Sequence, residues 1–177
     1  GTGANILAGI PEDATWYLHM DNTLTPKYTL TLKNFAYSGA GHYGSGIYAI
    51  GDLTIELVGD NSVTQAGGNL ASYGICVMGA LTIQGSGSLS ATGGNVTDND
   101  NNSHGIYAYD GNITIKDNAQ VTATGGSSDK DSYGLAGQSV NIEGNAQVTA
   151  VAGTATNSEI GIHGGTKGFT ATGGTTL

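Results

Sequence analysis

The chain has 177 residues, enough for one ordinary domain but too few for two separate hydrophobic cores. Its 31 glycines, two prolines and 11% charged residues fit neither a helical protein nor a disordered one, and they indicate an all-β fold with many tight turns. All five basic residues are lysines and the net charge is −9, which excludes a nucleic-acid binder and leaves neutral glycans or cations such as calcium as compatible partners.

Single features exclude further classes of protein. Cys76 is the only cysteine, so the chain forms neither an internal disulfide nor a cysteine-based zinc cluster. The longest apolar run, near residues 75–81, is interrupted by Gly79 and is far shorter than the ~20 residues that cross a bilayer, so we expect no membrane insertion. The chain begins at Gly1 without a methionine or a signal-like segment, which we interpret as a fragment of a larger multidomain chain.

The first 45 residues differ from the rest and are expected to form an atypical N-terminal coil or cap. Residues 28–33 alternate apolar and polar side chains as a strand does, and the same alternation returns in the later repeats. We therefore interpret residues 16–45 as a degenerate first coil that carries Trp16 and Tyr17.

From residue 46 to residue 177 the chain repeats itself every 27 to 31 residues. Each repeat begins with a step from glycine to an aliphatic residue, and the aliphatic members are Ile47, Ile75, Ile106, Leu135 and Ile162. A second strand follows at residues 53–55, 81–83, 113–115 and 140–142. A third strand is expected to begin at Val63, Leu89, Val121, Val148 and Phe169, so the last repeat lacks a middle strand on this interpretation.

A short unit with three strands cannot bury its apolar side alone, so the repeats must stack and share one core. The pattern predicts one domain over residues 1–177, folded as a right-handed parallel β-helix, a three-sided solenoid of about five coils. The aliphatic residues of the three strands are expected to point inward as columns. A propeller blade would need a fourth strand, and a leucine-rich repeat would show a different leucine frame.

The repeats resemble a known family. Residues 46–55 and 105–126, with weaker copies at Gly74 and Gly134, are similar to the clostridial carbohydrate-binding β-helix proteins in their Gly-Ile-Tyr-Ala, Leu-Thr-Ile and Val-Thr-Ala-Thr-Gly-Gly segments. The resemblance covers about residues 46–174. It implies a secreted bacterial protein, extracellular or on the cell surface, that binds plant polysaccharides such as cellulose and acidic pectins with calcium in the β-helix.

The loops between the third strand and the next glycine step vary in length and carry many carboxylates. Stacking is expected to place these loops at one corner, where acidic side chains from successive coils could converge on calcium. The predicted metal ligands are Asp98, Asp100, Asp129, Asp131 and Glu159. An EF-hand is excluded because Ser103 and Tyr109 stand where glycine and glutamate are needed, and the alternative is a solvated acidic turn.

Two aromatic-rich columns accompany the glycine steps. The residue before the glycine is Tyr73, His104, Tyr133 or Ile160, and the residue two positions after it is Tyr48, Cys76, Tyr107, Ala136 or His163. Flat rings one strand spacing apart, roughly 4.8 Å, could stack on sugar rings. The predicted carbohydrate-binding residues are Tyr48, Tyr73, His104, Tyr107 and Tyr133. Alternatively the rings only stabilise the stack, and the column before the glycine, which shares the parity of the inward aliphatic residues, fills a corner.

Catalysis finds little support in the sequence. A lyase needs a basic residue beside calcium and a glycoside hydrolase needs paired acids, whereas the strands carry only isolated acids such as Glu56 and Glu143. Outward pairs such as Thr122 and Thr124 resemble the threonine ladders of ice-binding proteins, a less favoured alternative. We therefore predict a non-catalytic bacterial module that binds a polysaccharide or cell-wall glycan with calcium assistance, the alternative being a structural stalk or adhesin spacer without a small ligand.

Overall fold

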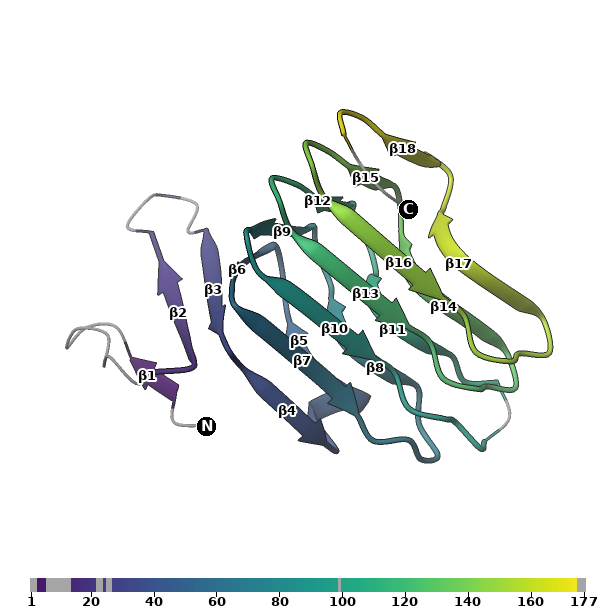
Figure 1. Ribbon diagram of the computed structural model, residues 1–177. Coiled ribbons are helices and arrows are strands. Elements are labelled where there is room, and N and C mark those ends of the chain that lie inside the picture. Colours follow the sequence, from purple (N-terminus) through teal and green to yellow (C-terminus); the bar gives the residue numbers. More distant parts are fainter. Residues whose placement is uncertain (1–2, 6–13, 22–23, 25–26, 99, 175–177) are drawn as a thin grey trace.

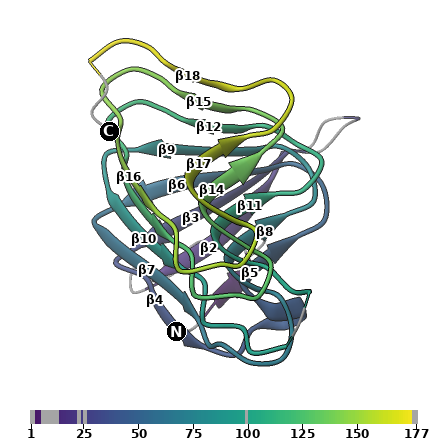
Figure 2. The same ribbon diagram turned by 90° about the vertical axis from the view of Figure 1, so that its right-hand side faces the viewer.

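The computed structural model describes residues 3–5, 14–21, 24, 27–98 and 100–174. These residues form a stack of parallel coils in which each coil contributes one strand to each of three sheets (Figure 1). In the view along the stack from its C-terminal end, the chain advances toward the viewer while it turns counterclockwise (Figure 2). The predicted right-handed parallel β-helix of about five coils is therefore confirmed.

The three sheets are called A, B and C in the order in which each coil visits them. Sheet A holds β1 (Gly3–Asn5), β2 (Trp16–Met20), β3 (Tyr28–Lys33), β6 (Leu53–Val58), β9 (Leu81–Gly85), β12 (Ile113–Ile115), β15 (Val140–Ile142) and β18 (Phe169–Ala171). Sheet B holds β4 (Ala36–Gly39), β7 (Asp60–Gln65), β10 (Ser88–Thr92), β13 (Gln120–Thr124) and β16 (Gln147–Val151). Sheet C holds β5 (Ser45–Ala49), β8 (Ser72–Val77), β11 (Ser103–Ala108), β14 (Asp131–Gly137) and β17 (Ser158–Gly164). A short 3-10 turn, His42–Gly44, precedes β5.

The core is a continuous column of aliphatic side chains inside the three sheets. Ile75, Ile106 and Leu135 pair in register from coil to coil in sheet C and are fully buried. Ile83 and Ile115 do the same in sheet A. Because every coil buries its apolar side only against its neighbours, the stack itself holds the strands in place.

A column of buried serines closes the corner between sheets B and C. The hydroxyl of Ser103 donates to the carbonyl of Gly94 at 2.8 Å and accepts the amide of Gly126 at 2.9 Å. Ser132 accepts the amide of Gly153 in the same way, at 2.8 Å. These serines satisfy backbone groups that the turn leaves without a ladder partner, which explains a serine at this position in successive coils.

The N-terminal part differs from the predicted degenerate coil. The first coil begins at β3, which pairs in parallel with β6, whereas β2 pairs with β3 in the antiparallel direction. Trp16 and Tyr17 thus lie on an added antiparallel strand and not within a coil. The prediction for residues 28–33 was right, and the inclusion of residues 16–20 in a coil was wrong, because a hairpin returns the chain along the edge of sheet A.

The third predicted column is shifted in one coil. Val63 is buried, but it pairs with Ala91, while Asn61 pairs with Leu89. The Asn61 amide satisfies the site by donating to the carbonyls of Val58, Gly59 and Ser88 and by accepting the Phe35 amide. An apolar pattern cannot reveal a column position that a hydrogen-bonded asparagine fills.

The assignment of Phe169 to the third strand was also wrong. Strand β18 pairs with β15 in sheet A, with Phe169 opposite Val140. The last repeat therefore has its middle strand. The resemblance of Phe-Thr-Ala-Thr-Gly-Gly to the third-strand segments misled the assignment, since both kinds of strand alternate apolar and hydroxyl side chains.

Candidate functional site

The glycine step reverses the direction of the side chains in sheet C. In β11, Ser103 lies inside the corner and Ile106 in the core, yet the rings of His104 and Tyr107 contact each other with centroids 5.0 Å apart. Both rings therefore face outward, because Gly105 and Ile106 take two successive inward positions. A Cβ on Gly105 would lie 2.5 Å from the amide nitrogen of Thr124 in sheet B, so only glycine fits.

The residue before the glycine is thus part of the outer face and does not fill a corner. The alternation of side chains predicted otherwise because the strand is not regular at the glycine. The same step occurs at Gly74 and Gly134, where an added Cβ would also lie within 3.0 Å of the sheet B backbone. The two aromatic-rich columns consequently stand side by side on the outside of sheet C.

Four rings form a continuous row across coils two to five. Tyr73 lies 5.4 Å from His104, His104 stacks on Tyr133 at 4.7 Å and 11°, and Tyr133 stacks on His163 at 4.8 Å and 8°. Tyr107 packs edge-on against His104 and contacts Tyr73 at 5.4 Å. The structure therefore brings together four of the five predicted carbohydrate-binding residues and adds His163.

The second column alternates large and small side chains from coil to coil. Its members in order are Tyr48, Cys76, Tyr107, Ala136 and His163, and the pairing of the strands places them in register. Beside the small residues, the rings of the first column lean over: Tyr73 toward Tyr107, and Tyr133 toward His163. The alternation leaves a hollow over Ala136.

This hollow, called the aromatic hollow below, has a volume of about 170 Å³. Rings and polar side chains line it together with Ala136 and two glycines, Gly137 and Gly165. The rings and polar groups are His104, Tyr107, Tyr109, Tyr133, His163, Asn102, Asp131 and Gln138. Flat apolar faces beside a few polar groups are the features of a small-ligand site.

Burial shifts the pKa values of four groups on this face in the direction that favours the uncharged form. It lowers the pKa of His104 to about 4 and raises the pKa of Tyr107 to about 12. It also raises the pKa of Tyr73, and it raises that of the Cys76 thiol to about 11 against the opposing hydrogen bond from Ser45. These three rings are therefore uncharged near neutral pH, and the Cys76 thiol is a poor nucleophile.

Tyr48, the fifth predicted residue, lies elsewhere. Its ring contacts Tyr43 at 5.1 Å and His42 at 6.3 Å, near the 3-10 turn. Tyr48 also lines a separate, largely apolar hollow of about 290 Å³ with residues that include Trp16 and Tyr28. The column position of Tyr48 was right, but Cys76 separates it from Tyr107 by two coils.

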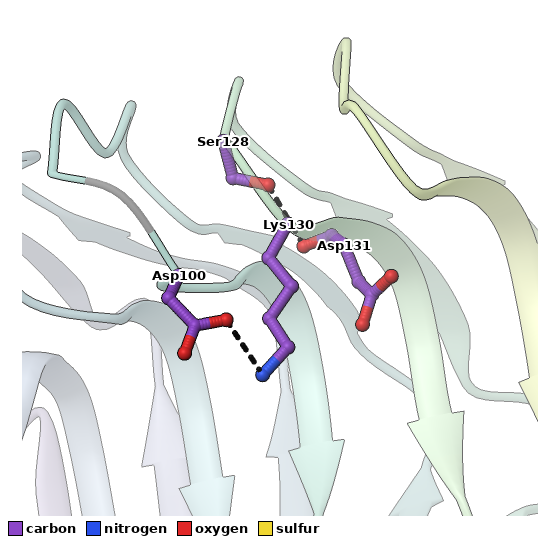
Figure 3. Close-up of polar contacts among 4 residues, drawn as sticks. All are labelled: Asp100, Ser128, Lys130 and Asp131. Atoms are coloured by element: carbon purple, nitrogen blue, oxygen red, sulfur yellow. Dashed lines mark hydrogen bonds and ion pairs between the residues drawn. The ribbon is translucent and has the colours of Figure 1, made fainter.

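The predicted metal ligands follow the third strand at the expected corner, but they do not converge. Figure 3 shows two of the five, Asp100 and Asp131. Lys130 bonds to Asp100 at 3.2 Å, and a Glu159 carboxylate oxygen accepts the Ala155 amide at 2.7 Å. Asp98 and Asp129 are exposed. Within the described ranges no three or more acids, histidines or cysteines form a cluster that could hold a metal ion, and calcium stays a prediction.

Two other hollows lie over sheets A and B, and their lining is less suited to a specific ligand. A polar hollow of about 220 Å³ over sheet B is lined mainly by hydroxyl and amide side chains such as Thr122, Gln120 and Gln147. Another, of about 370 Å³, lies over sheet A and includes Lys27, Asp52 and Thr82. Both are larger than the aromatic hollow, but neither combines stacked rings with converging polar groups.

Sequence reasoning missed several residues that line the aromatic hollow. His163 stood in the correct column and carried a signal that was not used, whereas Tyr109, Asn102 and Gln138 lie outside the two columns. These three residues reach the hollow only through the way the turns at the ends of the strands fold, which the repeat pattern does not reveal.

No protein-family model, curated protein or solved structure matches the chain. In the part of the chain that the structure describes, no helix has the length and apolar character that would let it cross a membrane.

Proposed function

We propose that the protein is a non-catalytic carbohydrate-binding module whose aromatic hollow holds a sugar ring of a polysaccharide. The observation that carries the proposal is the joint arrangement of Tyr107, Tyr133 and His163 around the small Ala136. Sugar rings present apolar C–H faces that pack on aromatic rings, while their hydroxyl groups need hydrogen-bond partners such as Gln138 and Asp131.

The repeats support this proposal through their resemblance to secreted bacterial polysaccharide-binding β-helices. The row of rings runs along the stack over four coils, and all of its members except the buried His104 are partly exposed, so a long chain has more than one ring to pack against. The fold alone argues for no particular ligand, since solenoids serve many functions. An extracellular or cell-surface location belongs to the same proposal.

Retention on a polysaccharide array, with and without a chelator, tests the proposal. We expect retention on one class of polysaccharide and a loss of roughly fivefold or more in Tyr107→Ala, since aromatic stacking contributes about 1 kcal/mol. Tyr43→Ala is the matched control, because Tyr43 is exposed and lies outside the aromatic hollow. Unfolding curves of both variants establish that the fold is retained.

A rigid spacer is the second candidate. The observation in its favour is the unbroken hydrogen-bonded register of the five coils, which makes the stack a stiff rod. If the folded protein is retained on no polysaccharide of the array, the result favours the spacer and contradicts carbohydrate binding.

A further inference from the structure

Asp131 gives one side of the aromatic hollow an unbalanced negative charge. Its side chain lies on the same outer face of β14 as the Tyr133 ring and lines the hollow. Lys130, the nearest cation in sequence, turns away to bond with Asp100 (Figure 3). That bond is the only ion pair found among the described residues, so within them no ion pair neutralises Asp131.

Asn102 adds a second unfilled acceptor at the adjacent position of the neighbouring coil. Ser103 pairs with Ser132, and Asn102 and Asp131 directly precede these two serines. The Asn102 Oδ1 atom is buried and accepts no hydrogen bond from the described residues. Less than 1 Å² of this atom is exposed, so it cannot bond to a ligand in the hollow unless its neighbours move, and the carboxylate of Asp131 sets the preference of this side.

The surroundings reinforce the sign of the charge. Asp110 is close enough to Tyr107 for its charge to help raise the pKa of the phenol, although burial is the larger cause. No lysine lines the hollow. Lys167 donates its backbone amide to the Gln138 carbonyl at 3.1 Å, but its side chain is not part of the lining.

We propose that the aromatic hollow prefers oligosaccharides of amino sugars with free amines, whose protonated amino group pairs with Asp131 while the ring packs on Tyr107 and His163. This inference rests on the proposed carbohydrate binding at the same hollow. The carboxylate and the ammonium group form a charge-assisted hydrogen bond, which is stronger than a bond between neutral partners. N-acetylation removes the positive charge, and a uronic acid places a second carboxylate against Asp131.

Calorimetric titration with three oligosaccharide series of equal length tests this preference. The probes are glucosamine oligomers, N-acetylglucosamine oligomers and galacturonic acid oligomers, all measured in the same buffer at about pH 6. We expect the glucosamine series to bind about fivefold more tightly than the N-acetylated series, with the galacturonic acid series weakest. The difference should shrink at high salt because screening weakens an exposed charge pair.

Two variants locate the effect. Asp131→Asn removes the charge at the hollow, and Glu143→Gln removes the same charge from an exposed position that does not line it. We expect Asp131→Asn to bring the glucosamine series down to the level of the N-acetylated series, and Glu143→Gln to leave the preference unchanged.

The outcomes separate this inference from the proposed function. Equal binding of the glucosamine and N-acetylglucosamine series, or the same loss in both variants, overturns the amine preference but leaves carbohydrate binding intact. Failure of every oligosaccharide and polysaccharide to bind the folded protein overturns both.

Discussion

His104 is joined to Tyr133 of the next coil by two different contacts. Its ring stacks on the Tyr133 ring with centroids 4.7 Å apart, and its Nδ1 atom accepts the Tyr133 backbone amide at 3.1 Å. The second contact requires an unprotonated nitrogen, because an imidazolium offers only donors. His104 is 1% exposed, so protonation would place an unpaired charge among buried rings.

Acid should therefore weaken the fold through His104. Burial lowers its pKa from 6.5 to about 4. Between these pH values His104 is protonated in the unfolded chain and unprotonated in the folded chain. Stability present above the unfolded pKa falls as the pH drops toward about 4, by on the order of 3 kcal/mol. Urea unfolding across this window should show a smaller loss in His104→Gln. Equal losses in both proteins would contradict the assignment, since their carboxylates are the same.

Removal of a corner hydroxyl should destabilise the stack. Ser103→Ala leaves the Gly126 amide and the Gly94 carbonyl without their partner inside a buried corner. We expect a loss of about 1–3 kcal/mol in the free energy of unfolding. Ser90→Ala, on the exposed face of sheet B, should change it by less than about 0.5 kcal/mol. Similar values for the two variants would show that the corner bond contributes little.

The glycine step should not tolerate a methyl group. In Gly105→Ala the new Cβ meets the Thr124 amide nitrogen at 2.5 Å and the Gly134 carbonyl oxygen at 2.8 Å, both of them backbone atoms. We expect a loss of at least about 1–3 kcal/mol, measured by thermal or urea unfolding. Gly68→Ala is the control, because an added Cβ there has no atom within 4 Å. A stable Gly105→Ala protein would refute the crowding argument.

Calcium should bind weakly if it binds at the loop corner. To gather the carboxylates, the ion must displace Lys130 from Asp100 and the Ala155 amide from Glu159. We therefore expect the melting temperature to rise only at roughly millimolar calcium, the range of weak extracellular sites. Magnesium at the same concentration controls for ionic strength. A melting temperature that does not move at millimolar calcium would reject the predicted metal role.

The sequence was sufficient for the fold because one aliphatic column per strand repeats at a nearly constant spacing. Ile75, Ile106 and Leu135 could be aligned without coordinates, and their alignment defined the coils. The alignment failed where a hydrogen-bonded polar side chain takes the place of an aliphatic one. Asn61 is such a position, and its amide occupies the apolar column through four hydrogen bonds.

The candidate site was less predictable than the fold. The columns of Tyr73 and Tyr107 could be read from the sequence, but their common outward direction depends on two successive inward residues at Gly105 and Ile106. Contacts such as Tyr133 with His163 run diagonally between columns, and they form because Ala136 is small. Periodicity predicts neighbours along a column and not across it.

The side-chain pattern on the outer face of sheet C repeats every two coils, whereas the pattern of the core repeats every coil. Aliphatic side chains fill most interior positions in every coil, but in the column Tyr48, Cys76, Tyr107, Ala136 and His163 a large side chain recurs only in every second coil. Duplication or deletion of a single coil would keep the interior continuous yet bring two bulky or two small members together. Adding or removing two coils at a time would preserve the surface pattern. We therefore expect such a protein to lengthen by even numbers of coils if it keeps this pattern.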